Sequence, residues 1–393
     1  MSQPLEGVKV IDLSRILAGP LCSMTLADFG AEVLKVENAA GDETRSWKPP
    51  VNAQGISTYY WSVNRNKQAV VADFADATQL QALRGLIRDA DVLVENFRPG
   101  VLAKFGLDYE SLRELNPALV YCSISGFGHT GPRRREAGYD AVMQGEGGLM
   151  SITGAADGPP YRLGVAIADI VTGMFAAQGI TAALLARERT GRGQAVDIAM
   201  LDSVAALLSY QAGIYFATNR APGRMGNRHP TIVPYETFSA SDGEFVLAVG
   251  NDDQWRRFCR VADLDEDERF ATNRQRVVAY DELRPLLAAR LRREPRGYWI
   301  ERLTAAGVPC GSVRDLAELF SDPQMAARAM VEEVQHAAVG PMRVLGTPLK
   351  LSETAASIRM PPPRLGEHTD SVLTSVAGVA TTELDALRAK GVI

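Results

Sequence analysis

Short apolar runs alternate with amphipathic runs over the first 125 residues. Apolar runs bounded by polar residues or glycine are typical of buried strands, and apolar positions three and four apart are typical of covering helices. Strands that alternate with helices predict an α/β fold, with a parallel sheet and helices on its faces. The expected strands are residues 8–13, 33–36, 91–94 and 118–123, and the expected helices are residues 21–29 and 78–88.

The second half of the chain predicts a smaller α+β domain inserted into the first. Helices over residues 170–187 and 201–218 flank a strand at 195–198, and a Gly-, Pro- and Arg-rich loop follows at 219–234. Strands at 245–249 and 308–313 enclose helices near Gln254, Leu283 and Trp299, and a strand at 341–351 returns to the first domain. The predicted layout is a large domain at 1–218, a linker at 219–234, a small domain at 235–330 and a return at 331–393.

The first turn of this Rossmann-like pattern has no dinucleotide signature. Residues 13–20 lack the G-x-G-x-x-G that cradles a pyrophosphate, and G-x-x-x-x-G-K-[ST] is also absent from the sequence. The pattern therefore predicts a Rossmann-like sheet that does not bind a nicotinamide cofactor through this turn.

Composition narrows the functional classes. A net charge of -5 and a pI near 5.6 argue against a general nucleic-acid binder. The four cysteines form no C-x-x-C pair and the four histidines are scattered, so no metal site is expected. The first residues are polar, and no uninterrupted apolar run is judged long enough to span a membrane. We expect a cytoplasmic protein with no membrane partner.

Asp169 is the main candidate for chemistry. It stands as a single carboxylate in the run of small and apolar residues 164–173, where a bulky ligand could approach the backbone. A carboxylate in this setting is a candidate nucleophile. Asp169 also precedes an apolar helix-like run, and its position alone favours a helix N-cap. Both roles are compatible, because the helix dipole would keep the carboxylate ionised.

Motifs along nearly the whole chain resemble the class III CoA-transferases, the CaiB/BaiF family that includes formyl-CoA transferase and carnitine CoA-transferase. The ordered set is specific, although each motif is short. It comprises residues 4–13 (PLEGVKVIDL), 18–20 (AGP), 28–37 (DFGAEVLKVE), 64–67 (NRNK), 94–100 (VENFRPG), 125–128 (SGFG), 190–194 (TGRGQ) and 365–370 (LGEHTD).

The resemblance implies an interlocked homodimer, with coenzyme A thioester as a substrate and no cofactor. It implies that Asp169 is the nucleophile and that Asp140 is a second acid beside it, although Asp140 could equally be a surface or capping residue. Arg98 and Lys104 are also compatible with plain solvated charge. The residues implied to bind CoA are Leu17, Ala18, Asn64, Lys67, Asn96, Phe97, Arg98 and Lys104.

The acceptor acid is expected to meet arginines. Residues 223–235 resemble the family members that act on short dicarboxylates such as succinate and glutarate. Arg224 and Arg228 on this loop, and Arg15 elsewhere, could hold a distal carboxylate in bidentate fashion; the alternative is a basic linker. Formyl-CoA transferase has glutamine at the position of Leu17, so oxalate is not the expected acceptor.

Two other functions remain open. The related acyl-CoA racemases use a histidine where this chain has Tyr139, and a tyrosine is a poor base near neutral pH. A non-catalytic CoA-binding protein is the third possibility, and the Asp169 context argues against it. The expected activity is therefore CoA transfer from a succinyl-CoA-like donor to a short carboxylic acid, through an aspartyl-CoA thioester.

Overall fold

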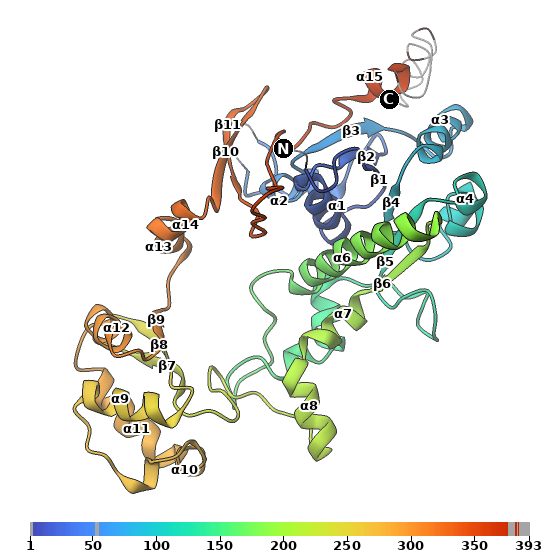
Figure 1. The fold of residues 1–393 in the computed structure, drawn as a ribbon. Helices are drawn as coiled ribbons and strands as arrows, with labels where there is room; N and C mark the ends of the chain where they lie inside the picture. Colours follow the sequence, from blue (N-terminus) through green and yellow to red (C-terminus); the bar gives the residue numbers. More distant parts are fainter. Residues whose placement is uncertain (1–2, 52–54, 376–381, 383, 385–393) are drawn as a thin grey trace. The chain divides into compact units, whose positions relative to one another are not determined.

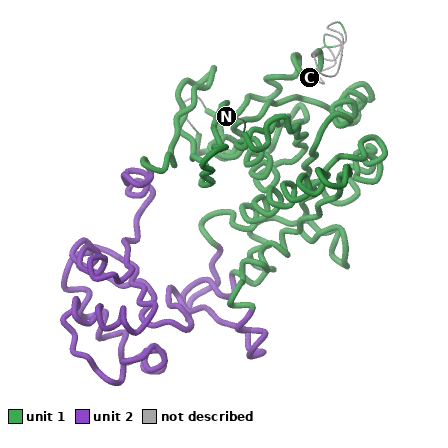
Figure 2. The backbone as a smooth tube through the Cα atoms, viewed as in Figure 1, with its two compact units in different colours: residues 1–149, 163–212, 326–393 green, residues 150–162, 213–325 purple. Residues whose placement is uncertain are grey.

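The computed structural model describes residues 3–51, 55–375, 382 and 384. The chain divides into two compact units, shown in Figure 2. Unit 1 contains residues 1–149, 163–212 and 326–393, and unit 2 contains residues 150–162 and 213–325.

Unit 1 is built on a six-stranded parallel sheet of order β3-β2-β1-β4-β5-β6 (Figure 1). All five strands expected in this part of the chain are present. The edge strand β3 was missed, because only three of its five residues are plainly apolar. The strands are β1 (Lys9–Asp12), β2 (Glu32–Glu37), β3 (Lys67–Val71), β4 (Val92–Glu95), β5 (Val120–Ser125) and β6 (Ala195–Ala199).

Helices cover both faces of this sheet. On one face, α1 (Ala18–Asp28) and α6 (Ile167–Thr190) bury Leu26 and Ile180 against Val92 and Val120. On the other face, α3 (Ala77–Arg88) and α4 (Tyr109–Leu115) enclose a second apolar core. The order of the sheet reverses between β1 and β4, so the loops that follow these strands meet at the carboxyl edge where ligands of such sheets bind.

Helix α6 is the central helix of unit 1. A Cβ on Gly173 would lie 2.5 Å from the carbonyl oxygen of Ala18, so only glycine lets α6 approach α1 this closely. By length and composition α6 is apolar enough to cross a membrane, although Thr172, Gln178 and Thr181 interrupt its apolar run. Half of its apolar window is buried inside the protein, as in the core helix of a folded domain.

Further helices follow the sheet strands. The single helix expected at 201–218 is two helices, because Ser209 adopts a left-handed φ of 45° that interrupts the helical path. These helices are α2 (Thr58–Ser62), α5 (Asp140–Glu146), α7 (Met200–Leu207) and α8 (Ser209–Thr218), with the 3-10 helices η1 (Glu43–Ser46), η2 (Leu102–Phe105) and η3 (Leu149–Ser151).

The C-terminal part of unit 1 closes the free edge of the sheet. β10 (Val331–His336) and β11 (Gly340–Leu345) pair with each other as a hairpin, so the strand expected at 341–351 does not join the large sheet. Farther along, the amide of Ala69 on β3 donates to His368 Nδ1 (3.2 Å), and the amide of Val71 donates to Thr369 Oγ1 (3.0 Å). The last described helix, α15 (Thr369–Ser375), begins there.

Unit 2 combines a small antiparallel sheet with helices around one core. The core includes Phe245, Phe258 and Trp299, all at most 1% exposed. The strands are β7 (Tyr235–Ser239), β8 (Glu244–Ala248) and β9 (Cys310–Ser312), and the helices are α9 (Asp252–Ala262), η4 (Glu268–Phe270), α10 (Asn273–Val278), α11 (Tyr280–Leu291), α12 (Arg296–Ala305), α13 (Leu316–Phe320) and α14 (Pro323–Ala327).

The units do not follow the boundaries expected from the sequence. Residues 150–162 interrupt the large domain expected at 1–218, and they belong to unit 2 with residues from 213 onward. The contacts are specific: Arg224 Nη2 donates to the carbonyl of Gly158 (2.8 Å), and the amide of Gly226 donates to the carbonyl of Gly154 (2.9 Å). The expected linker at 219–234 is therefore bonded to a segment that is distant in sequence, which a linear pattern does not reveal.

Candidate active site

Asp169 lies in the first turn of α6. The helix begins at Ile167 and its N-cap is Ala166, so the N-cap role expected for Asp169 is wrong. The neighbouring Ala168 is buried, and Asp169 itself is half-buried. The carboxylate is therefore placed by the helix without being used to cap it.

Asp140 performs the capping of α6. Its Oδ1 accepts from the amide of Ala168 (2.8 Å), and its Oδ2 accepts from Gln144 Nε2 (2.8 Å). Asp140 begins α5, and a Cβ on the preceding Gly138 would lie 2.5 Å from the Cα of Gly126. That close crossing of two backbones sets where α5 starts. Asp140 therefore combines capping, which the sequence left open, with proximity to Asp169.

The Asp169 carboxyl is held near its point of titration. Burial, together with the smaller effect of the like charge on Asp140, raises its pKa from 3.8 to about 7. Both carboxylates also contribute, after burial, to raising the pKa of Tyr59 to about 12. The expectation that the helix dipole keeps Asp169 firmly ionised is therefore wrong, because burial and Asp140 outweigh it. Tyr59, which stacks edge-on against Trp47 at 4.8 Å between ring centroids, was missed by sequence analysis.

An apolar cluster includes residues on both sides of Asp169 in the chain. Leu17 packs with Ile16, Tyr59, Ala166 and Ile170, the last two on either side of Asp169 in the chain. Leu17 is buried, and so is Ala18. The structure thus brings Leu17, which the resemblance implies to bind CoA, into one cluster with the helix turn that carries Asp169.

Asn64 and Lys67 lie in the interior. Lys67 Nζ donates to Asp12 Oδ2 (3.0 Å), to the carbonyl of Pro20 (2.9 Å) and to Asn64 Oδ1 (2.9 Å), and both side chains are at most 1% exposed. The expected direct contact with CoA does not fit this burial. These residues instead connect β3 to β1 and to the start of α1. Their residue types alone do not distinguish CoA binding from this structural role.

Asn96 and Arg15 join the two loops at the switch point. Asn96 Oδ1 accepts from the amide of Arg15 (2.8 Å), and its Nδ2 donates to the carbonyl of Arg15 (2.7 Å). The Arg15 guanidinium lies 5.0 Å from the centroid of the Phe97 ring and pairs with Glu43 (2.6 Å). Asn96 therefore positions the Arg15 backbone, while roles for Asn96 and Phe97 in CoA binding and for Arg15 in acceptor binding stay predictions.

A cavity of about 360 Å³ lies beside the carboxyl end of β4 and the first halves of β5 and β6. Arg98 lines it, together with Glu95, Ser123 and Asp197, which are register neighbours on the three strands. Burial raises the pKa of Glu95 to about 7. Arg98 and Lys104 are both exposed, as a residue that meets a phosphate from solvent must be.

Arg224 and Arg228 belong to unit 2 and have different surroundings. The Arg224 guanidinium donates to the carbonyls of Gly158 and Ala155. The Arg228 guanidinium lies 3.5 Å from the centroid of the Tyr280 ring, and within the described chain its buried Nε has no hydrogen-bond partner. Arg228 is therefore the better placed of the two to accept a new anionic partner.

Across residues 3–51, 55–375, 382 and 384, there is no group of three or more His, Cys, Asp or Glu side chains that could hold a metal ion.

Comparison with known proteins decides the family. The sequence model of CoA-transferase family III matches residues 5–369. The chain belongs to CoA-transferase family III. It is 43% identical to the succinate–glutarate CoA-transferase of Agrobacterium fabrum over 96% of this chain and 97% of that protein. It is 40% identical to the human succinyl-CoA:glutarate CoA-transferase, over all of this chain and 90% of that protein.

A solved structure of the same family agrees with the fold. The CaiB/BaiF family protein from Brucella suis aligns with a TM-score of 0.87 at 43% identity, over 96% of this chain and all of that one. The chain is thus a class III CoA-transferase with a mixed α/β fold, and the resemblance seen in its motifs is confirmed.

Proposed function

We propose that this enzyme moves CoA from succinyl-CoA, or a similar donor, to a short dicarboxylic acid through a covalent aspartyl-CoA thioester on Asp169. The observation that carries the proposal is the Asp169 carboxyl itself, half-buried in an apolar cluster beside Asp140 with a pKa near 7. Near neutral pH such a group is partly ionised, and its ionised form is weakly solvated, which favours nucleophilic attack.

The proposed reaction has four substitutions at carbonyl carbon. An Asp169 oxygen attacks the donor thioester carbon and the C–S bond breaks. CoA thiolate departs, and the donor acyl group and Asp169 form a mixed anhydride. The thiolate then attacks Cγ of Asp169 and expels the donor acid, forming the aspartyl-CoA thioester. The acceptor carboxylate attacks Cγ and releases the thiolate, which finally attacks the acceptor acyl carbon and regenerates the Asp169 carboxylate. No net proton is taken up, and no cofactor is required.

Water exclusion matters for this route because an anhydride hydrolyses readily. The cluster of Ile16, Leu17, Tyr59, Ala166 and Ile170 provides apolar surface around the helix turn of Asp169. Phosphate groups of CoA are assigned to Arg98 and Lys104, whose exposed cationic side chains follow β4.

The dicarboxylate acceptor rests on relatives named as acting on glutarate and on the chemistry of Arg228. A guanidinium stacked on Tyr280 with an unbonded Nε offers donors to a second carboxylate. Arg224 and Arg15 remain secondary candidates, because Arg224 already bonds carbonyl groups and Arg15 Nη1 pairs with Glu43, although Arg15 Nε, like Arg228 Nε, has no partner among the described residues.

A homodimer is part of the proposal. Apolar side chains stand exposed on α6 and α8, including Met174 (52%), Leu185 (58%) and Phe216 (80%). Exposed apolar side chains of this size mark association surfaces when they lie together. Sedimentation analysis should give the mass of two chains. Cytoplasmic location is likewise proposed.

The decisive experiment incubates the protein with succinyl-CoA and a panel of acids. New CoA esters mean transfer, exchange of the α-hydrogen means the isomerase alternative, and neither reaction means a CoA-binding protein. Asp169→Ala and Asp169→Asn should both abolish transfer while keeping the unfolding temperature. Hydroxylamine or borohydride trapping followed by mass spectrometry should mark Asp169, and substantial turnover by Asp169→Ala would refute the mechanism.

A further inference from the structure

The turn between β1 and α1 is fixed through its backbone. The Ser14 amide donates to Asp12 Oδ1 (2.9 Å), and the Ser14 carbonyl accepts from Lys35 Nζ (2.9 Å). The next residue, Arg15, has both its amide and its carbonyl bonded to the Asn96 side chain. Side chains from β1, β2 and the loop after β4 thus hold two consecutive residues.

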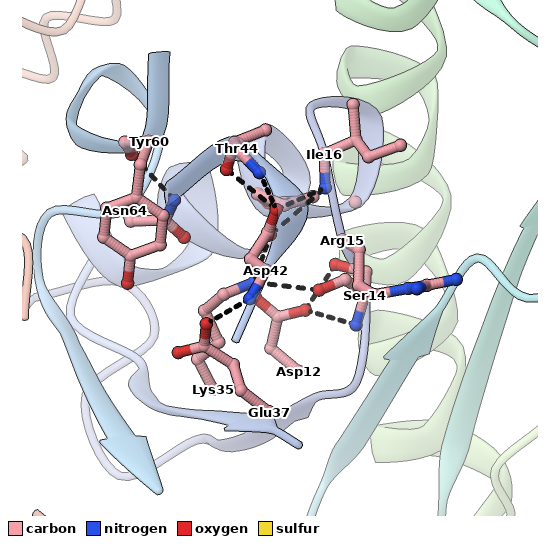
Figure 3. A network of polar contacts seen from close by, with 12 residues as sticks. Asp12, Ser14, Arg15, Ile16, Lys35, Glu37, Asp42, Thr44, Tyr60 and Asn64 are labelled. Carbon is pink, nitrogen blue, oxygen red and sulfur yellow. Dashed lines mark hydrogen bonds and ion pairs between the residues drawn. The ribbon is translucent and has the colours of Figure 1, made fainter. Parts of the chain in front are cut away.

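Asp42 holds the third residue of the turn. Figure 3 shows its carboxylate surrounded by donors: the amide of Ile16 (3.1 and 3.3 Å), Lys35 Nζ (3.0 Å), and the amide (3.0 Å) and hydroxyl (2.7 Å) of Thr44. Burial alone would raise the pKa of Asp42, but Lys35 and the Thr44 bonds lower it, so the carboxylate is charged. Lys35 and Asp42 are both fully buried at this contact.

Ile16 has a backbone conformation that its side chain disfavours. Its φ is 72°, in the left-handed region, where a β-branched residue is an outlier. Such strain persists only where the surroundings over-determine it, and it concentrates at functional sites. The strained residue also carries a side chain of the cluster with Leu17, Ala166 and Ile170, around the helix turn of Asp169.

We propose that Asp42 is a positioning residue for CoA transfer, which holds Ile16 in its left-handed conformation so that Ile16 and Leu17 keep water from the Asp169 carboxyl. The role rests on the proposed function, because it concerns the protection of the intermediates on Asp169. Asp42 touches neither substrate nor the reacting atoms; it acts through the Ile16 backbone.

Asn is the informative substitution at position 42. Asp42 Oδ2 faces the Ile16 amide and Lys35 Nζ, and Oδ1 faces two backbone amides beside the Thr44 hydroxyl, so in either orientation the amide nitrogen of Asp42→Asn would face a backbone N–H. Ile16→Gly removes the conformational penalty, because glycine adopts positive φ readily. Ile16→Ala shortens the side chain but keeps the penalty. Comparing Gly with Ala at position 16 therefore separates backbone strain from lost side-chain packing.

The experiment measures Asp42→Asn in the wild-type, Ile16→Gly and Ile16→Ala backgrounds. In the wild-type and Ala backgrounds we expect kcat for transfer to fall roughly 10- to 100-fold, as for a displaced reacting group. We also expect the hydrolysed share of the acyl-CoA consumed to rise. In the Ile16→Gly background the same substitution should cost several-fold less. Asp28→Asn is the matched control: it breaks another buried ion pair of unit 1, with Arg65 at 2.6 Å, and its effect should be equal in all backgrounds.

A second readout does not depend on catalysis. The unfolding temperatures of the single and double variants form a double-mutant cycle, in which Asp42→Asn and Ile16→Gly should couple while Asp28→Asn and Ile16→Gly should not. Equal effects of Asp42→Asn in all backgrounds, in both kcat and unfolding, would overturn the proposal. If wild-type enzyme transfers no CoA, the proposed function fails, and the unfolding cycle still decides whether Asp42 holds Ile16.

Discussion

The Asp140 carboxylate caps the helix that carries Asp169. One oxygen of Asp140 accepts from the amide of Ala168, the residue directly before Asp169, and its charge helps to raise the pKa of Asp169. The same group therefore fixes the nucleophile in place and tunes its ionisation.

This pairing predicts the pH dependence of catalysis. Only the ionised Asp169 attacks, and its pKa is raised to about 7, so kcat/KM for acyl-CoA should fall about tenfold per pH unit below 7 and level off above it. Asp140→Asn removes the like charge, so the pKa of Asp169 should drop. The acidic limb of the pH–rate profile, where kcat/KM falls, should then move to lower pH. Glu146→Gln removes a carboxylate from the other end of α5, where it pairs with Arg133, and should leave the limb unchanged. A limb that stays at pH 7 in Asp140→Asn would show that burial alone sets the pKa.

Binding of CoA phosphates should depend on Arg98 and Lys104. Each contact is distant from the reacting carbon, so Arg98→Ala and Lys104→Ala should raise the KM for succinyl-CoA and change kcat less. Arg88→Ala, which removes an equally exposed cation from the end of α3, controls for net charge. Steady-state kinetics with acceptor at saturation test this, and an unchanged KM in both variants would identify the two side chains as solvated charge.

Acceptor choice should depend on Arg228. Loss of a charged partner from a desolvated carboxylate costs on the order of 2–5 kcal/mol. Arg228→Met should therefore weaken succinate and glutarate far more than butyrate. Arg224→Met should also lower the unfolding temperature, because Arg224 bonds the carbonyls of Ala155 and Gly158, whereas the exposed Arg220→Met should change neither property. If wild-type enzyme prefers butyrate, or Arg228→Met keeps the dicarboxylate preference, Arg228 does not bind the acceptor.

Burial of Glu95 should make the stability of the fold depend on pH, independently of catalysis. Burial raises its pKa from 4.5 to about 7, so the unfolded chain ionises first as pH rises. Its contribution to stability is full below pH 4.5 and is lost as pH rises through 7, by about 3 kcal/mol at 1.36 kcal/mol per pKa unit. Glu95→Gln should remove that loss, so that its stability relative to wild type is higher at pH 8 than at pH 5. Urea unfolding at both values tests this, with the exposed Glu110→Gln as control; equal shifts at both pH values would contradict the burial of a charge.

Sequence patterns predicted the parts of this enzyme that depend on local periodicity. Five of the six parallel strands, and α1, α3 and α6, were found because buried strands and covering helices have distinct spacings. The start of α6 was placed three residues late, because its cap comes from Asp140, 28 positions away. The Asp140 side chain reaches the start of α6 only in the folded protein, so the residues around Asp169 do not reveal this cap.

Polar residues were harder to assign than apolar ones. Lys67 was expected at the CoA site, yet its ammonium is buried against Asp12, because a motif shows that a cation is present and not which partner neutralises it. Ile16 gave no signal of its left-handed backbone, since the constraint arises from Asp42. Both outcomes depend on contacts between elements that are far apart in the chain.

The tail that completes β3 has a consequence for synthesis. The bonds from Ala69 and Val71 reach residues 299 and 298 positions later. At roughly 5–20 residues per second, a ribosome needs roughly 15–60 s to make that length of chain. During this interval the backbone groups on the outer edge of β3 are unpaired and can pair with a strand of another nascent chain. Truncation before residue 368 would leave this edge open permanently, so His368 and Thr369 protect β3 from strand pairing only after the rest of the sheet has been synthesised.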